Sequence, residues 1–335
     1  MTINKKIPDE ITDFEKLKME LSKARTTLKV GKKFQDKNKN RQDLPAQYFE
    51  SECAEIANME EKILQLEAIL ATEPPAPELP PCQPLIKVVG ILEEFRVQKI
   101  MGYFGAREYD PEAFAREEER NQVGSLLLAI TGNVVGSAVT GQSQVRLRDC
   151  SDFVRGKING IPFHGWLGKT HVRNDDYVEM AVIAKDDHYV VYAIMFPEVR
   201  TLSITPRCRC GREADIRFAT FYASSVLTTI FLVILVIFFF KGLDWEGLAG
   251  ISAMFAATMI LVFAIATRKT RKKPEPTFRL AENIFAILGF SDPQDVDLRT
   301  LTKKRIKALS SNSSHVTDRE MPSRRSAWVD YFYYY

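Results

Sequence analysis

The alternation of hydrophobic and polar positions divides this chain into segments, and two uncharged stretches near its end differ most from the rest. Residues 218–240 and 247–267 contain no charged side chain, and each is at least as long as the ~20 apolar residues that cross a bilayer as a helix. Only residues 241–246 separate them, too few for a folded domain. The pattern predicts a transmembrane hairpin over residues 218–267. The alternative, a pair of buried core helices, is disfavoured because core helices keep a polar face.

Basic residues on both sides give the predicted hairpin a direction. Four arginines lie within residues 207–217 and five lysines or arginines within residues 268–273, whereas the short connecting loop holds a single lysine. Positively charged flanks stay on the cytoplasmic side of a membrane. Both the N- and C-termini are therefore predicted to be cytoplasmic, with the lipid bilayer as the partner of the hairpin.

Two sets of small residues predict close helix packing. Spacings in multiples of four place small side chains on one helical face, which lets a neighbouring helix approach closely. The sets are Ala249, Ala253 and Ala257 in the second apolar stretch, and Gly124, Gly132 and Gly136 in an uncharged, glycine-rich apolar segment over residues 121–145. Three alternatives stay open for that segment: a buried helix or strand pair, a membrane-inserted helix, and a re-entrant or conditionally inserting segment.

The first 72 residues predict two helices. Apolar side chains recur with a coiled-coil spacing on both sides of a basic polar stretch. We interpret residues 1–72 as a coiled-coil-like helical hairpin that pairs with itself or mediates self-association or contact with a protein partner. Six prolines within residues 73–84 then exclude a helix or a central strand and predict an extended linker.

The middle of the chain has the pattern of β structure. Residues 85–150 predict a mixed β/α region that contains the glycine-rich segment. Residues 151–206 alternate apolar and polar positions over five short strands, and Asn159-Gly160 is a strong hairpin signal because both residues tolerate positive φ. A small antiparallel β-barrel-like module is expected here. The fold class is then an α+β membrane protein.

The last segment, residues 274–335, predicts a short helical tail on the cytoplasmic side. Apolar spacing indicates one helix over residues 278–288 and a second, basic helix over residues 296–309. The final residues are strongly aromatic. They add a strand to a sheet edge, lie at the membrane interface or form a disordered end, and the pattern alone does not choose among these.

Composition and motifs exclude several function classes. A formal net charge of +3 over 335 residues is too small to favour nucleic acid as a partner. The five cysteines lack the C-x-x-C spacing of zinc and redox sites and are predicted to be free thiols. The sequence contains no P-loop, Rossmann fingerprint, G-x-S-x-G or H-E-x-x-H motif. No cofactor is therefore assigned.

Three histidines of the β module, His164, His171 and His188, are the candidates for chemistry. Histidine serves as a metal ligand and as a general base, but no spacing places two of these on one helical face. The register between strands of a barrel is what would bring two of these histidines together. Asp186 and Asp187 form a carboxylate pair in a turn, where aspartates usually cap the backbone. We assign no catalytic residue and no metal ligand, and expect these histidines at turns and strand ends.

The β module and the segments after it resemble a known family. Residues 156–182 and 186–208, a transmembrane pair and residues 278–304 follow one another as in bacterial membrane proteins of a type VI secretion system effector family. The likeness covers residues 85–304 and is most specific in the run G-x-x-F-x-G-W-x-G-K-T at residues 160–170 with D-H-Y at residues 187–189. The candidate binding residues are Phe163, His164, Trp166, Lys169, His188 and Tyr189. Of these, Phe163 and Trp166 are equally suited to be core anchors.

This resemblance implies a multi-pass protein of the bacterial inner membrane that acts with type VI secretion, as an effector or a companion protein. The leading hypothesis is a non-enzymatic protein, anchored by the hairpin, that binds a partner through its β module. One alternative is a pore-forming or membrane-depolarising toxin that uses residues 121–145 together with the hairpin. The other is a hydrolase with its site in the β module.

Overall fold

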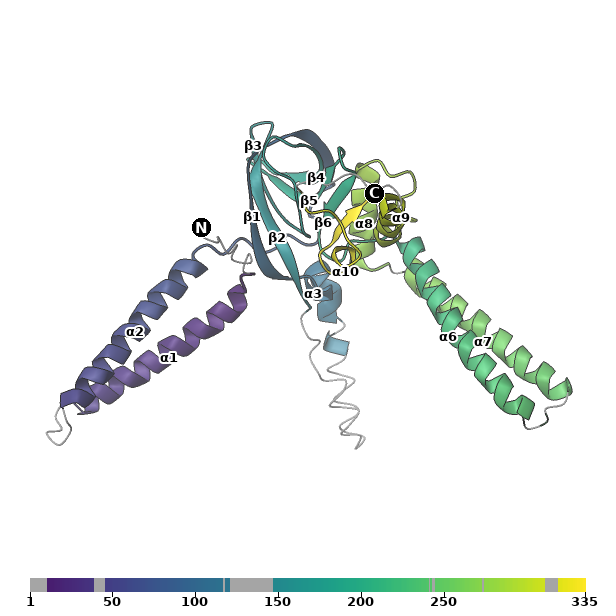
Figure 1. Ribbon diagram of the computed structural model, residues 1–335, viewed down its shortest axis with the longest axis horizontal. Coiled ribbons are helices and arrows are strands. Elements are labelled where there is room, and N and C mark those ends of the chain that lie inside the picture. Colours follow the sequence, from purple (N-terminus) through teal and green to yellow (C-terminus); the bar gives the residue numbers. More distant parts are fainter. Residues whose placement is uncertain are drawn as a thin grey trace. The chain divides into compact units, whose positions relative to one another are not determined.

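The computed structural model describes residues 11–38, 46–116, 118–120, 147–240, 242, 245–272, 274–310 and 319–335 (Figure 1). The chain divides into two compact units, Met1–Ala76 with Lys99–Met101, and Pro77–Gln98 with Gly102–Tyr335. The division after Ala76 falls inside the predicted linker. Gly124, Gly132 and Gly136 lie outside the described residues, so their predicted helix packing and the three alternatives for their segment are untested.

The first unit contains two long helices, α1 (Phe14–Asn38) and α2 (Ala46–Leu70). Exposed ion pairs join them, such as Arg25 Nη2 with Glu67 Oε1 at 2.8 Å, but each exposed pair contributes at most about 1 kcal/mol. Apolar contact therefore holds α1 against α2, and it is made by the buried side chains of Leu21, Ala24, Ile63 and Leu66.

The second unit is built on a seven-stranded sheet with the order β3-β2-β1-β4-β5-β6-β7. The strands are β1 (Ile86–Tyr103), β2 (Arg148–Ile158), β3 (Ile161–Leu167), β4 (Tyr177–Ala184), β5 (Tyr189–Phe196), β6 (Thr201–Ile204) and β7 (Phe332–Tyr334). The five strands expected up to residue 206 are present as β2 to β6. The turn between β2 and β3 has the predicted positive φ at Asn159 and Gly160, +53° and +77°. Because β1 lies between β2 and β4, it belongs to the same sheet as the predicted β module.

A second pairing of β3 connects distant strands of this sheet. Besides its antiparallel pairing with β2, β3 pairs in parallel with β5, matching Phe163 with Tyr189 and Gly165 with Val191. Gly165 permits this approach, because a Cβ at that position would overlap the carbonyl oxygen of Val191. The main core of the unit fills the space between these strands, and its fully buried members include Leu92, Val154, Met180 and Val182.

A short helical region follows β1, within the predicted mixed β/α region of residues 85–150. Helix α3 (Ala106–Tyr109) is followed by helical residues 111–116 and 118–120. Asp110 caps that second stretch, because its Oδ1 accepts a hydrogen bond from the Ala113 N–H at 2.9 Å. The buried hydroxyl of Tyr109 donates to the carbonyl of Pro206, so this region is tied to the segment after β6.

The tail returns to the sheet after the apolar helices. It contains α8 (Pro276–Ile287), α9 (Leu298–Ser310), α10 (Ser326–Val329) and β7. Strand β7 pairs antiparallel with β6, Thr201 opposite Tyr334 and Ser203 opposite Phe332, and Figure 1 shows it in yellow beside the sheet. Of the three alternatives for the aromatic end, the added edge strand is therefore the one observed.

The two apolar stretches form helices α6 (Arg212–Phe240) and α7 (Trp245–Lys272). Each contains a window long and apolar enough to cross a membrane, with mean hydropathies of 2.2 and 2.3. Neither window is buried inside the protein. The helices lie side by side (Figure 1), and the rings of Phe231 and Phe255 stack between them with centroids 4.3 Å apart.

The alanine stripe of α7 does not make this contact. Ala249, Ala253 and Ala257 are exposed, whereas Phe255 turns toward α6. A phenylalanine ring buries more apolar area against a neighbour than a methyl group does, so the aromatic face gives the larger gain on packing. The close approach predicted for this stripe is therefore not made by α6, and its prediction for another helix stays a prediction.

Candidate functional site

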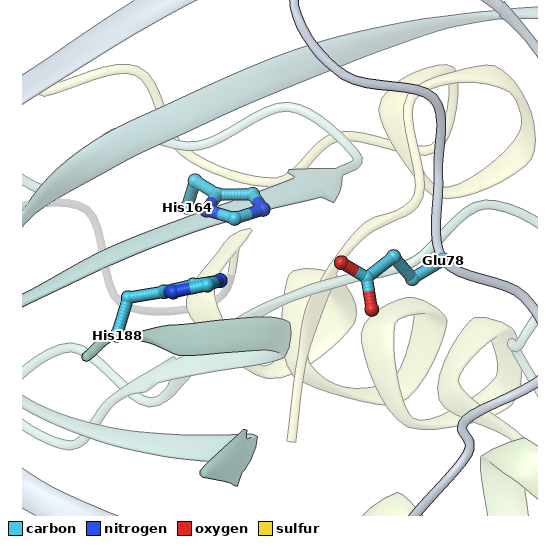
Figure 2. A group of neighbouring side chains, drawn as sticks. All are labelled: Glu78, His164 and His188. Carbon is cyan, nitrogen blue, oxygen red and sulfur yellow. The ribbon is translucent and has the colours of Figure 1, made fainter. Parts of the chain in front are cut away.

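Three polar side chains from separate parts of the second unit meet in space: Glu78, His164 and His188 (Figure 2). One ligand atom of each lies within 4.8 Å of the others. The two imidazole rings stack with centroids 4.9 Å apart and an interplanar angle of 25°. All three residues are partly exposed, so solvent reaches the group. In the part of the chain that the structure describes, no other three such side chains approach as closely.

Strand register brings the two histidines together. His164 lies in β3, and His188 directly precedes β5. The parallel pairing matches Phe163 with Tyr189, so His188 lies two positions from His164 along the pair. Side chains two residues apart project from the same face of a sheet. The register effect anticipated from the sequence is therefore observed for His164 and His188.

Glu78 reaches the group from the Pro-rich segment. The Tyr192 hydroxyl, on β5, donates to the carbonyl oxygen of Glu78 at 2.8 Å. The Lys185 ammonium lies 2.6 Å from the Glu78 carboxylate. Lys185 and His188 belong to one turn, which is closed by the Lys185 N–H donating to the His188 carbonyl at 2.9 Å. The β4–β5 turn therefore positions both the imidazole of His188 and the cation that holds Glu78.

The surroundings set the charge of this group. Burial, and then the neighbouring His188, lower the pKa of His164 below its ordinary value, so its imidazole is neutral at pH 7. His188 Nδ1 lies 2.5 Å from Asp187 Oδ1, and this hydrogen bond lowers the pKa of the Asp187 carboxyl. The hydrogen bond to Glu78 raises the pKa of Lys185. Neutral imidazole nitrogen beside carboxylate oxygen can hold a borderline metal ion or hydrogen-bond a polar partner.

Most other residues of the resemblance motif serve the fold. Phe163 lies in the main core. Trp166 is buried, with its ring 5.5 Å from that of Phe153. Tyr189 is partly buried against the main core. Of the six candidate binding residues, only His164 and His188 therefore join the group around Glu78.

Lys169, the remaining candidate, contacts the tail. Its ammonium forms an ion pair with Glu320, and its backbone N–H donates to the Asp330 carbonyl at 2.6 Å. Next to it, a Cβ at Gly168 would overlap the carbonyl oxygens of Asp330 and Tyr331. The Gly-Lys pair of the motif thus forms a docking place for the tail backbone.

His171 lies apart from the other two histidines. Its Nε2 is 3.3 Å from the Thr201 hydroxyl, and its ring packs between Phe196 and Phe332 at 5.5 and 5.0 Å. Burial lowers the pKa of His171 to about 4, and the Arg319 guanidinium acts in the same direction. The three histidines therefore do not form one catalytic site.

The cysteines give no second site. All five, Cys53, Cys82, Cys150, Cys208 and Cys210, are free thiols, as predicted. Burial raises the pKa of Cys208 and Cys210 to about 12. The C-x-C pair therefore stays protonated at neutral pH, whereas metal binding and redox exchange need the thiolate.

Sequence reasoning missed Glu78 and Lys185. Glu78 lies among prolines, a composition that predicts an extended linker and carries no information about where the linker docks. Lys185 directly precedes the aspartate pair of a predicted turn. An acidic residue in a linker and a basic residue in a turn form a pair only through the tertiary fold, so no local signal would have found them.

The buried His171 predicts a loss of stability in mild acid. Its pKa is about 4 in the folded chain and 6.5 when solvated, so between these values only the unfolded chain takes up the proton, and stability falls as the pH falls. From pH 7.5 to 5.0 this loss is about 2 kcal/mol. Urea unfolding in detergent should show that His171→Gln removes about this much of the pH dependence. Equal pH dependence in both proteins would contradict the assignment.

Comparisons of this chain with protein-family models, with curated proteins and with solved structures gave no match. The resemblance to type VI secretion effectors thus stays a prediction from the motif at residues 160–170.

Proposed function

We propose that this chain is a non-enzymatic binding protein of the bacterial inner membrane, anchored by α6 and α7 and associated with type VI secretion. The observation that supports it is the pairing of β6 with β7. Strand β6 ends before α6 begins, and β7 follows α7, yet Thr201 lies opposite Tyr334 in one antiparallel ladder.

This pairing restricts the possible topologies. Two strands cannot exchange backbone hydrogen bonds through a bilayer, because the hydrocarbon core separates its two sides by ~30 Å. If α6 crosses the membrane, α7 must return to the side from which α6 started. The two helices then form a hairpin with the sheet and the tail on one side.

Further contacts hold the two ends of the helix pair together. The Arg271 guanidinium, near the end of α7, binds the Glu213 carboxylate near the start of α6 through two hydrogen bonds of 3.0 and 3.1 Å. Directly before α6, the Gly211 N–H donates to the carbonyl of Val296 in the tail at 3.0 Å. A Cβ at Gly211 would overlap the carbonyl oxygen of Gln294. The entry to α6, the exit of α7 and the tail thus share one base.

The exposed apolar surface supports a membrane as the surroundings of the pair. Phe221 on α6 is 76% exposed and Met254 on α7 is 73% exposed. A water-soluble chain rarely leaves a large continuous apolar surface uncovered, and lipid would cover it. The helices α6 and α7 also differ from the core helices of soluble proteins in that neither apolar window is buried.

The finer parts of the proposal follow from charge and packing. The basic flanks favour the cytoplasm for the sheet, the tail and both termini. The α1–α2 pair is suited to a helical hairpin that contacts a protein partner or a second copy. The double pairing of β3 favours a barrel-like closure of the β module that presents the group around Glu78.

The two alternative functions gain nothing from the described residues. The pore-forming alternative rests on residues 121–145, which lie outside the described residues. The hydrolase alternative gains no support, because His171 lies apart from His164 and His188.

The topology predicts how single cysteines react from each side of the membrane. With Cys53, Cys82 and Cys150 replaced by serine, Glu198→Cys and Lys272→Cys should react with an impermeant thiol reagent only after the inner membrane is opened. Glu246→Cys, in the first turn of α7 next to the connecting loop, should react in intact spheroplasts. Labelling of Glu198→Cys and Lys272→Cys from opposite sides would rule out the hairpin. The parent without added cysteine is the control for the buried Cys208 and Cys210.

The association with type VI secretion predicts a conditional phenotype. Deleting the gene should change the outcome of contact-dependent competition between bacterial strains when the secretion apparatus assembles. The same deletion in a strain that lacks the apparatus should have no effect. An equal change in both strains would contradict the association with type VI secretion. It would leave the proposed membrane topology unaffected.

A further inference from the structure

We propose that Glu78, His164 and His188 bind a divalent transition-metal ion, of which Zn²⁺ fits best, and that the bound ion fastens the Pro-rich segment to the sheet. This inference concerns a ligand of the β module and does not depend on the membrane topology. It rests on the type of the three side chains, their spacing, the hydrogen bond behind His188 and the cation already paired with Glu78.

The distances between the three ligand atoms approach those found between the ligands of a bound ion. Zinc takes nitrogen and oxygen ligands at ~2.0–2.2 Å, so two ligands of a tetrahedral ion lie about 3.4 Å apart. The atoms of this group lie within 4.8 Å of one another. Figure 2 shows that both rings direct a nitrogen toward the Glu78 carboxylate. Glu78 and His188 lie outside the regular strands, so their positions can adjust when an ion draws the ligand atoms together.

A hydrogen bond orients His188 for this role. Its Nδ1 lies 2.5 Å from Asp187 Oδ1, and a carboxylate only accepts, so Nδ1 carries a proton and Nε2 is the atom of this ring left to coordinate an ion. A carboxylate behind a ligating imidazole is the usual arrangement in metal sites, where it fixes the tautomer and the ring. His164 is neutral at pH 7 because burial lowers its pKa. The ring of His164 therefore presents a lone pair for coordination.

Lys185 pairs with the Glu78 carboxylate in the metal-free protein. Its ammonium lies 2.6 Å from the Glu78 carboxylate and contributes to the lowered pKa of His164. A divalent ion between these ligands repels the ammonium, so the metal and Lys185 compete for Glu78. The Glu78 carboxylate is then held by Lys185 without metal, and through the ion by two imidazoles with it. Metal binding would strengthen an attachment that already exists.

The ligand set selects the class of ion. Ca²⁺ and Mg²⁺ take oxygen ligands almost exclusively, whereas two imidazoles and one carboxylate suit first-row transition ions. Three protein ligands leave a fourth position of a tetrahedral zinc ion for water. The partial exposure of all three residues leaves room for that water. Zn²⁺ is thus the probe for the test.

The test measures Zn²⁺ binding to the purified full-length chain in detergent. Cys53 and Cys82 are replaced by serine, because these exposed thiols would bind zinc themselves. We expect one ion per chain in titrations against a chromophoric chelator. Glu78→Gln, His164→Gln and His188→Gln should each weaken Zn²⁺ binding at least about tenfold. Changing a residue that only orients a metal ligand already costs about that much, and these substitutions remove a ligand itself. Lys185→Met should strengthen it, because the competing cation is gone.

A matched control and a second measurement keep the test decisive. His171→Gln removes a histidine of the same sheet unit and should leave Zn²⁺ affinity unchanged. Zn²⁺ should also slow amide hydrogen exchange in residues 77–84 of the parent and not of Glu78→Gln, which reports attachment of the segment independently of any activity. No stoichiometric binding by the parent would overturn the proposal. So would binding that the three ligand substitutions leave intact, or that His171→Gln weakens equally.

Discussion

The structure depends most on one short ladder of backbone hydrogen bonds, the pairing of β6 with β7. It joins two segments that are separated in the chain by both apolar helices and most of the tail. Backbone pairing requires strands within ~4.8 Å of each other, so the segments on either side of α6 and α7 are parts of one folded unit. The long apolar helices then leave that unit and return to it at the same place. A loop of two such helices can be covered by lipid without disturbing the fold at its base.

This constraint also explains residues that the resemblance motif marked as candidates for binding. Gly168 has no side chain because the backbone of the tail passes directly over it, and Lys169 binds the tail through both its N–H and its ammonium. Gly165 similarly leaves space for the backbone of β5. A pattern of glycines around a lysine often indicates a ligand site. Here these glycines and this lysine contact other parts of the same chain. The motif records how the unit closes upon itself.

The sequence predicted the elements better than their assembly. Alternation located β2 to β6 and the Asn159-Gly160 turn, and hydropathy located α6 and α7, because each of these signals arises within one segment. The position of β1 between β2 and β4, and the parallel pairing of β3 with β5, depend on contacts between distant segments that periodicity does not encode. The same limit applies to the site. His164 and His188 were named from their chemistry, whereas Glu78 and Lys185 join them only through register and through docking of a linker. The alanine stripe of α7 does not face α6, because small residues permit close packing without requiring it.

The hairpin topology requires that β6 and β7 pair in the membrane-bound protein, and an engineered disulfide tests this pairing directly. Thr201 and Tyr334 face each other in a pair flanked by the hydrogen bonds of Arg200 and Tyr335, the close antiparallel spacing that suits an engineered bridge. In bacterial membranes, with the exposed cysteines replaced by serine, the pair Thr201→Cys and Tyr334→Cys should oxidise to an intramolecular disulfide. The shifted pair Thr201→Cys and Phe332→Cys should form much less. Failure of the matched pair to oxidise, or equal yields from both pairs, would contradict the account.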